Sequence, residues 1–249
     1  MTALNLAIDV VLGAAFGFLG GLFGIGGGII AIPILGLVFG MSEQLAQGTA
    51  LVMVVPNVML GLWRYYQKRS LNVRYGVTLA ICSAPMTYVG ARFATGVPSS
   101  PLRIAFALFT IVIASYALWR TFGRGEHAVA QAPWYAISVL GAVAGGVSGI
   151  FGVGGSVFAV PIMAAFFGLT QAAAQSLGLA LVAPGTLVGL ATYAAAGDVD
   201  WISGAALGIG GLATVSLGVD MAHRLPDRTL KRIFALFLFA SAAALLAHR

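Results

Sequence analysis

The chain has few charged residues and almost no cysteine. Only 8% of its 249 residues are Asp, Glu, Lys or Arg, whereas a soluble globular domain carries about 25%. Hydrophobic residues make up 60%, and the mean hydropathy is +0.99. This balance excludes an ordinary soluble enzyme and a disordered chain. The net charge of +6 is spread between apolar runs, which argues against a nucleic-acid partner. The single cysteine, Cys82, excludes an intrachain disulfide.

The chain also lacks the motifs of enzyme active sites and metal centres. It contains no His-Glu-x-x-His, no Cys-x-x-Cys and no pair of carboxylates inside an apolar run. Its one glycine-rich stretch has no strand–helix–strand pattern around it, so a dinucleotide site is not expected. We therefore predict no catalytic residue, no metal and no cofactor. The N-terminus has no basic segment before its apolar run, and a cleaved signal peptide is not expected.

Long apolar segments recur along the whole chain. A helix that crosses a bilayer needs about 17–25 such residues. Segments of this length predict helices at residues 4–22, 44–63, 75–94, 102–121, 134–150, 172–195, 201–222 and 230–247. Two shorter apolar segments, 29–39 and 157–167, reach across about half a hydrocarbon core. Each is expected to be a re-entrant half-helix or one half of a broken span.

The second half of the chain repeats the first half without gaps. Residues 23–34 align with residues 151–162, with seven of twelve positions identical. The same alignment, here called the repeat register, pairs Gln47 with Gln175 and Tyr65 with Tyr193. Chance matches in an apolar chain do not place rare residues in one register. We predict a duplicated unit, with a first repeat at 1–121, a cytoplasmic linker at 122–132 and a second repeat at 133–249.

Basic residues predict how the repeats cross the membrane. Cytoplasmic loops are enriched in Lys and Arg. The loop after residue 63 is basic, whereas its counterpart in the second half carries Asp198 and Asp200. In the loop after the next span the bias is reversed, because the second half has more Lys and Arg there than the first half. Placing the basic regions inside puts 10 of the 13 Lys and Arg residues in the cytoplasm. Equivalent loops then lie on opposite sides, so the repeats are inverted and both termini are outside.

Each repeat has a glycine-rich break before its short apolar segment. Four glycines in five residues disfavour helix, and an unwound backbone inside a membrane needs protein or a water-filled cavity around it. If the short helix begins near Ile30, Pro33 lies in its first turn, where a missing N–H costs nothing. A helix N-terminus with bare backbone suits an anion, and close helix packing is the alternative. The predicted binding residues of the two breaks are Gly26, Gly27, Gly28, Gly154, Gly155 and Ser156, with Pro33 and Pro161 as gating residues.

Few other polar side chains lie at membrane depth, where such groups are functional candidates. The amides of Gln47 and Gln175 have donors for an anion, with an interhelical hydrogen bond as the alternative. Asn57 follows Pro56 in mid-span and is a further binding candidate, although a simple kink is the alternative. Pro56 and its counterpart Pro184 are predicted to act in gating.

Two charged residues occupy equivalent positions near the ends of spans. Arg92 either attracts or gates an anion, or extends to the interface. Asp220, its counterpart in the second half, either carries a coupling proton or pairs with a basic residue one turn away.

The doubled motif Phe-Gly-[Ile/Val]-Gly-Gly-[Gly/Ser]-x4-Pro, at residues 23–33 and 151–161, resembles the sulfite exporter TauE/SafE family of membrane permeases. The span ending at Gly90-Ala-Arg-Phe-Ala and its counterpart at Gly218 also resemble that family. The resemblance covers nearly the whole chain. It implies two homologous halves and transport of sulfite, sulfoacetate or related anions. The family often has Arg at the position of Arg92 in both halves, whereas the second half here has Asp220.

These observations predict an all-α polytopic membrane protein with two inverted repeats, each of about four full spans plus a short half-helix. We expect a transporter in the cytoplasmic (inner) membrane that exports a small sulfur-containing anion by alternating access. A permease or channel for another solute, such as a carboxylate or metal cation, is the alternative. The expected partners are a small anionic substrate and the lipid bilayer, with no nucleic acid; association into a homo-oligomer stays open.

Overall fold

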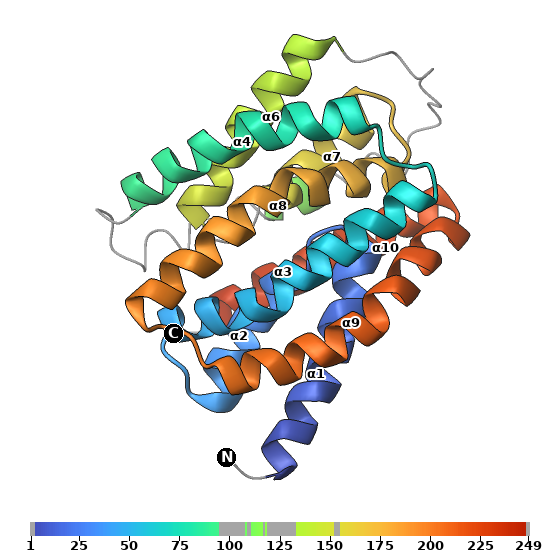
Figure 1. Cartoon of the computed structure of the whole chain (residues 1–249). Helices are drawn as coiled ribbons and strands as arrows, with labels where there is room; N and C mark the ends of the chain where they lie inside the picture. Colours follow the sequence, from blue (N-terminus) through green and yellow to red (C-terminus); the bar gives the residue numbers. More distant parts are fainter. Residues whose placement is uncertain are drawn as a thin grey trace.

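The computed structural model describes residues 3–94, 108, 111–116, 118, 133–151 and 155–247. Regular structure within these ranges is entirely helical (Figure 1). The first half contains α1 (Ala3–Phe23), α2 (Gly28–Phe39), α3 (Glu43–Gln67) and α4 (Val73–Ala94). The second half contains α6 (Trp134–Phe151), α7 (Ser156–Phe166), α8 (Gln171–Ala196), α9 (Trp201–Arg224) and α10 (Asp227–Ala247). The predicted linker at 122–132 and most of the predicted span at 102–121 lie outside the described residues.

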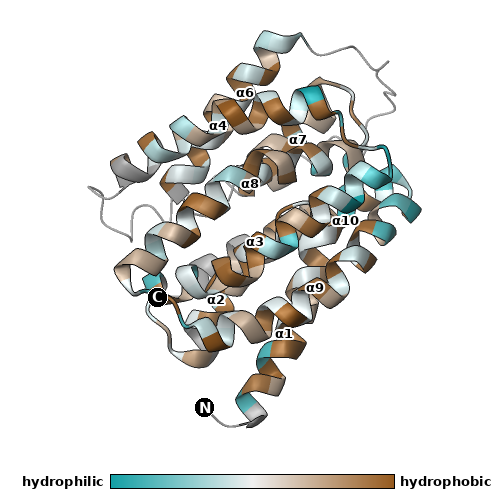
Figure 2. Cartoon of the chain, viewed as in Figure 1, coloured by the Kyte–Doolittle hydropathy of each residue, from teal (hydrophilic) through white to brown (hydrophobic). Residues whose placement is uncertain are grey.

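The helices have the lengths and composition of membrane spans, which confirms the predicted all-α polytopic membrane class. Four described helices are long and apolar enough to cross a bilayer alone: Asn5–Phe23, Gln44–Gln67, Gln171–Ala196 and Trp201–Arg224. The helices α4 and α10 have 22 and 21 residues but carry more charge near their ends. Figure 2 shows the hydrophilic residues gathered around the end of α3 and the start of α10. The short helices α2 and α7 have 12 and 11 residues, as their apolar segments predicted.

The first glycine break is a tight left-handed turn. Gly24, Gly26 and Gly27 have φ values of 68°, 74° and 91°, a region that residues with a Cβ rarely adopt. The turn is complete at Gly27, so α2 begins at Gly28. Pro33 therefore lies in the second turn of α2, and the prediction that it falls in the first turn is wrong. Its counterpart Pro161 has the same place in α7.

The first helix packs lengthwise against a helix of the other half. Along α1, a glycine at every fourth position touches the backbone of α9. A Cβ on Gly17 would lie 2.4 Å from Gly211, and one on Gly21 would lie 2.2 Å from the carbonyl oxygen of Val215. Because the numbers of the contacting residues rise together on both helices, α1 and α9 run parallel. Small residues allow transmembrane backbones to approach this closely.

The helices α4 and α6 form a second contact of the same kind. A Cβ on Gly145 would lie 2.4 Å from the carbonyl oxygen of Ser83, and one on Gly90 would lie 2.4 Å from that of Gly146. The repeat register relates Gly17 to Gly145 and Gly211 to Ser83. Each half thus places its first helix against the fourth helix of the other half, so the core is built between the halves.

Candidate functional site

The repeat-paired glutamines each contact a repeat-paired tyrosine. The hydroxyl of Tyr65, on α3, lies 3.1 Å from Oε1 of Gln175 on α8. The hydroxyl of Tyr193, on α8, donates to Oε1 of Gln47 on α3. In the repeat register, each of these tyrosine–glutamine contacts is the equivalent of the other. In each contact, the start of one helix meets the end of the other, so α3 and α8 run antiparallel at the centre of the molecule.

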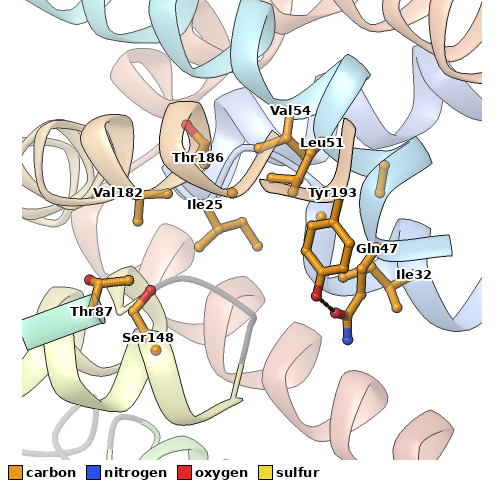
Figure 3. A pocket seen from close by; sticks show the side chains of 15 residues that line it. Ile25, Ile32, Gln47, Leu51, Val54, Thr87, Ser148, Val182, Thr186 and Tyr193 are labelled. Carbon is orange, nitrogen blue, oxygen red and sulfur yellow. Dashed lines mark hydrogen bonds between the residues drawn. The ribbon is translucent and has the colours of Figure 1, made fainter. Parts of the chain in front are cut away.

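One of these contacts borders a cavity of about 180 Å³. Figure 3 shows Tyr193 and Gln47 on one side of it and Thr87 and Ser148 on another. Of the predicted binding residues, Gly28 and Gln47 line the cavity. The full lining is Ile25, Gly28, Ile32, Gln47, Ala50, Leu51, Val54, Thr87, Ser148, Gly149, Val182, Gly185, Thr186, Gly189 and Tyr193.

The cavity offers neutral polar groups and a helix N-terminus. Gly28 is the first residue of α2, and the first N–H groups of a helix have no intrahelical partner. Together with the helix dipole they give this end a partial positive charge. The hydroxyl of Thr87 donates to Ser83 at 2.9 Å and that of Thr186 to Ala183 at 2.9 Å. The lining residues that the structure describes include no Asp, Glu, Lys or Arg, so the wall offers a ligand the helix N-terminus and uncharged polar groups.

The other predicted glycines are packed against protein. A Cβ on Gly27 would lie 2.6 Å from the carbonyl oxygen of Phe16, and one on Gly26 would lie 2.6 Å from the side chain of Val58. In the second half, a Cβ on Gly155 would lie 2.1 Å from the carbonyl oxygen of Ala144. These surroundings match the packing alternative raised for the glycine breaks. Gly154 lies outside the described residues.

Three further predicted binding residues are fully buried and have unpartnered polar atoms. Ser156, Gln175 and Asn57 are 0% exposed. The Ser156 hydroxyl, Nε2 of Gln175 and both amide atoms of Asn57 have no hydrogen-bond partner. Ser156 begins α7, as Gly28 begins α2. The repeat register relates these three to Gly28, Gln47 and Gly185, which line the cavity. We call the enclosed surroundings of these three residues, which belong to both halves, the closed counterpart of the cavity.

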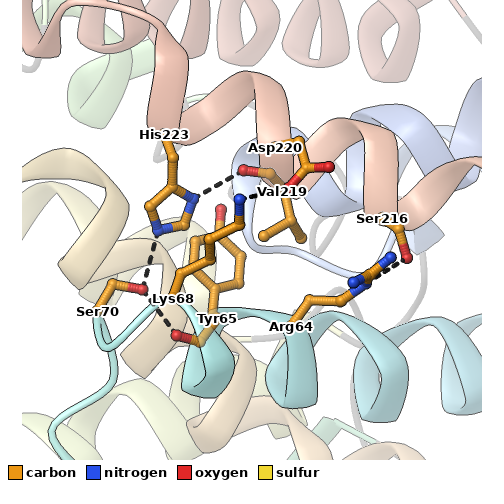
Figure 4. A network of polar contacts seen from close by, with 8 residues as sticks. All are labelled: Arg64, Tyr65, Lys68, Ser70, Ser216, Val219, Asp220 and His223. Carbon is orange, nitrogen blue, oxygen red and sulfur yellow. Dashed lines mark hydrogen bonds and ion pairs between the residues drawn. The ribbon is translucent and has the colours of Figure 1, made fainter.

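A polar network covers this closed counterpart at the end of α3 (Figure 4). Lys68 forms an ion pair of 2.9 Å with Asp220, and Arg64 donates to Ser216 at 3.0 Å.

In the same network, Nε2 of His223 lies 3.1 Å from the Ser70 hydroxyl, which donates to the Tyr65 carbonyl at 3.0 Å. The His223 ring also packs against the Tyr65 ring. The network therefore links the polar end of α9 to the tyrosine that contacts Gln175.

The predicted gating residues are dispersed. Pro33, Pro56, Pro161 and Pro184 all lie inside continuous helices. Asp220 is bonded to Lys68 of α3, rather than to the basic residues on its own helix that we had considered. Arg92 belongs to α4, and its side chain lies outside the described residues.

Sequence reasoning did not identify several polar residues. Tyr65 and Tyr193 were paired by the repeat, and the equal spacing of each from a paired glutamine was the available signal. Thr87, Ser148 and Thr186 were hidden among many hydroxyls in apolar helices. Asp9 is fully buried in α1, and a lone acidic residue in a candidate span is the signal that would have singled it out.

The family model described as sulfite exporter TauE/SafE matches residues 10–245. A probable membrane transporter protein of Methanocaldococcus jannaschii is 30% identical over 207 residues, covering 80% of this chain and 76% of the relative.

Two bacterial relatives cover more of the chain. A probable membrane transporter protein of Xylella fastidiosa is 28% identical over 97% of this chain and 95% of its own length. A probable membrane transporter protein of Bacillus subtilis, YunE, is 24% identical over 94% of this chain and 95% of its own length. The similarity therefore extends over both halves.

Proposed function

We propose that the chain, which belongs to the sulfite exporter TauE/SafE family and is an integral membrane transporter, is an exporter. Its proposed substrate is a small sulfur-containing anion, sulfite or an organosulfonate, which it moves by alternating access. The observation that carries the proposal is the uncharged cavity between the halves, into which the N-terminus of α2 opens at Gly28. The family description supports the sulfur anion, and the cavity supports an anion of small size.

The cavity wall accounts for selection by charge. A helix N-terminus and an amide stabilise negative charge through N–H donors. In the absence of a lysine or arginine in the wall, binding stays weak enough for release. A cation permease would need carboxylates or soft ligands, and the described residues contain no group of three or more His, Cys, Asp or Glu able to hold a metal ion.

The difference between the two equivalent regions supports alternating access. The cavity near Gln47 is open, whereas the region around Gln175 and Ser156 is closed and retains unpartnered donors. In a carrier built from two related halves, opening the closed region and closing the open one exchanges the roles of the halves. The Gln47 end carries the acidic loop with Asp198, which the charge rule places outside. On this proposal, the cavity near Gln47 faces the outside of the cell.

Membrane energetics set the direction. With a negative cell interior, export of each negative charge is favoured by about 2.3 kcal/mol per 100 mV. Export of a sulfur dianion therefore needs no coupling ion.

Ligand-dependent stabilisation of the purified protein tests the substrate. The ligands are sulfite, sulfate, thiosulfate, sulfoacetate, taurine, phosphate, acetate and divalent cations. A ligand at 100 times its Kd stabilises by about 2.7 kcal/mol. Selective stabilisation by one sulfur anion supports the proposal, whereas a response to acetate alone supports a carboxylate permease and a response to cations alone overturns the anion site. Flux into proteoliposomes then separates a carrier, in which unlabelled substrate on the far side accelerates exchange, from a channel.

A further inference from the structure

Asp9 is a buried carboxylate that the proposed transport site does not use. It lies in α1, within the candidate span Asn5–Phe23, and its exposure is 0%. Neither carboxylate oxygen has a hydrogen-bond partner. The equivalent residue of the second half is Ile137, also 0% exposed, so the fold accepts an apolar side chain there. Packing alone does not require an acid at this position.

The described surroundings of Asp9 contain no cation. It faces the start of α9, where Ser203 is a polar neighbour and the negative charge of Asp200 acts on it. The Ser203 hydroxyl is itself buried and unpartnered. The helices packed against α1 include α9, α3 and α2, and Phe23, the last residue of α1, meets Phe234 and Phe237 of α10. Neither α1 nor α2 contains a basic residue.

The basic residues of α9 and α3 lie at the far ends of these helices. Arg224 is the last residue of α9, about 30 Å beyond Ser203 at the helical rise. The start of α3 adjoins Asp200, whose N–H donates to Thr49 at 3.0 Å. Arg64 lies in the last turn of α3, about 22 Å beyond Thr49. The basic side chains of α9 and α3 therefore lie far from Asp9, and the contact of α10 with α1 at Phe23 is about 21 Å from Asp9 at the helical rise.

We infer that Asp9 is a proton-binding site, occupied when α1 is packed against α9 as in this structure. An ionised carboxylate that has neither a cation nor water beside it, and only one uncharged hydroxyl as a polar neighbour, is strongly disfavoured, and the carboxylate of Asp200 adds repulsion. A metal cation is a poor occupant, since hard cations take about six or more oxygen ligands and only one carboxylate and one hydroxyl face each other here. A proton needs a single oxygen.

Proton release then requires a structural change. One turn beyond Asp9 and Ser203, α1 and α9 touch at Gly13 and Leu207, where a Cβ on Gly13 would lie 2.1 Å from the Leu207 carbonyl oxygen. Water reaches Asp9 only if α1 and α9 separate at this end. Proton occupancy is thereby linked to an interface between the two halves. This inference goes beyond the proposed function and does not depend on the identity of the substrate.

Infrared spectroscopy of the purified protein tests the site without any substrate. A protonated carboxylic acid has a C=O stretching band that an ionised carboxylate lacks. At pH 8 exposed carboxyl groups, which titrate near pH 4, are ionised, and Asp9 is the only fully buried carboxyl among the described residues. We expect the band in the wild type, its loss in Asp9→Asn and its retention in Asp198→Asn, which removes a partly exposed acid from the same end.

Three results decide the inference. Absence of the band in the wild type at pH 8, or its persistence in Asp9→Asn, overturns the site. Should Asp9→Asn fail to fold, Asp9→Glu takes its place: a band that changes frequency in Asp9→Glu belongs to this residue, and an unchanged band overturns the site. After transfer into D₂O, the band should shift at least tenfold more slowly than exposed amides exchange. An immediate shift overturns the enclosure by α1 and α9.

Discussion

Lys68 and Asp220 join α3 to α9 through an ion pair of 2.9 Å, with side chains that are 44% and 34% exposed. An exposed pair of this kind contributes about 0–1 kcal/mol. It lies beside Tyr65 and His223 in the polar network at the end of α3 (Figure 4). The pair is thus better suited to holding a closed end together weakly than to carrying a proton through the membrane.

This pair gives a first prediction. Asp220→Asn should lower the free energy of unfolding by less than about 1 kcal/mol and leave the pH dependence of sulfite flux unchanged. It should also make the closed end open more often, which raises the labelling rate of a cysteine placed at Ser176. The exchanged pair Lys68→Asp with Asp220→Lys should return labelling toward the wild-type rate. A lost pH dependence in Asp220→Asn would restore this residue as the proton carrier.

The two tyrosines should differ in their effects, although the repeat pairs them. The Tyr65 hydroxyl is buried and also lies 2.9 Å from the carbonyl oxygen of Gly21. Its removal in Tyr65→Phe leaves buried acceptors unpaired, which costs about 1–3 kcal/mol and is measured by thermal unfolding. Tyr193 borders the cavity, so Tyr193→Phe should weaken ligand binding more than stability. Equal losses of stability in the two variants would contradict this distinction.

Neighbouring glycines provide a matched pair. Gly27→Ala places a Cβ at φ 91° and 2.6 Å from the Phe16 carbonyl oxygen, and the left-handed backbone alone costs about 1–2 kcal/mol. Gly28→Ala meets only Val54, at 3.3 Å, and should fold. Because its methyl group enters the cavity beside the α2 N-terminus, anion affinity should fall roughly tenfold, as expected for one hydrogen bond to a charged group. Calorimetry on Gly28→Ala that shows unchanged affinity would remove this end of α2 from the site.

The membrane orientation is open to chemical labelling. In a Cys82→Ser background, a cysteine at Asp198 should react with an impermeant thiol reagent in intact cells. A cysteine at Arg69 should react only after the membrane is opened, because basic loops stay inside. The reverse pattern would invert the orientation and make the cavity face the cytoplasm.

Local pattern allowed the helices to be predicted with little error. Apolar length placed α2 and α7 within one residue of their observed bounds. The glycine break was located correctly, but its conformation was not. Three left-handed glycines finish the turn sooner than composition indicates, and this moved Pro33 into the second turn.

The site was less accessible to prediction because it depends on contacts between the halves. The sequence paired Gln47 with Gln175, yet nothing in the register says that one borders a cavity and the other is enclosed. That difference arises from partners far along the chain, such as Tyr193 and Tyr65. Most predicted glycines proved to contact protein atoms, since the same lack of a side chain serves both close packing and ligand binding.

The exchange of first helices between the halves has a consequence for how the protein is made. During synthesis α1 leaves the ribosome early, but its partner α9 begins only at Trp201. Until then the glycine face of α1, with Asp9 near its start, has no matching surface within the protein. The first half is consequently not a unit that matures alone. Two separately produced fragments, cut within 122–132, should recover a functional protein only when both are present in the same membrane.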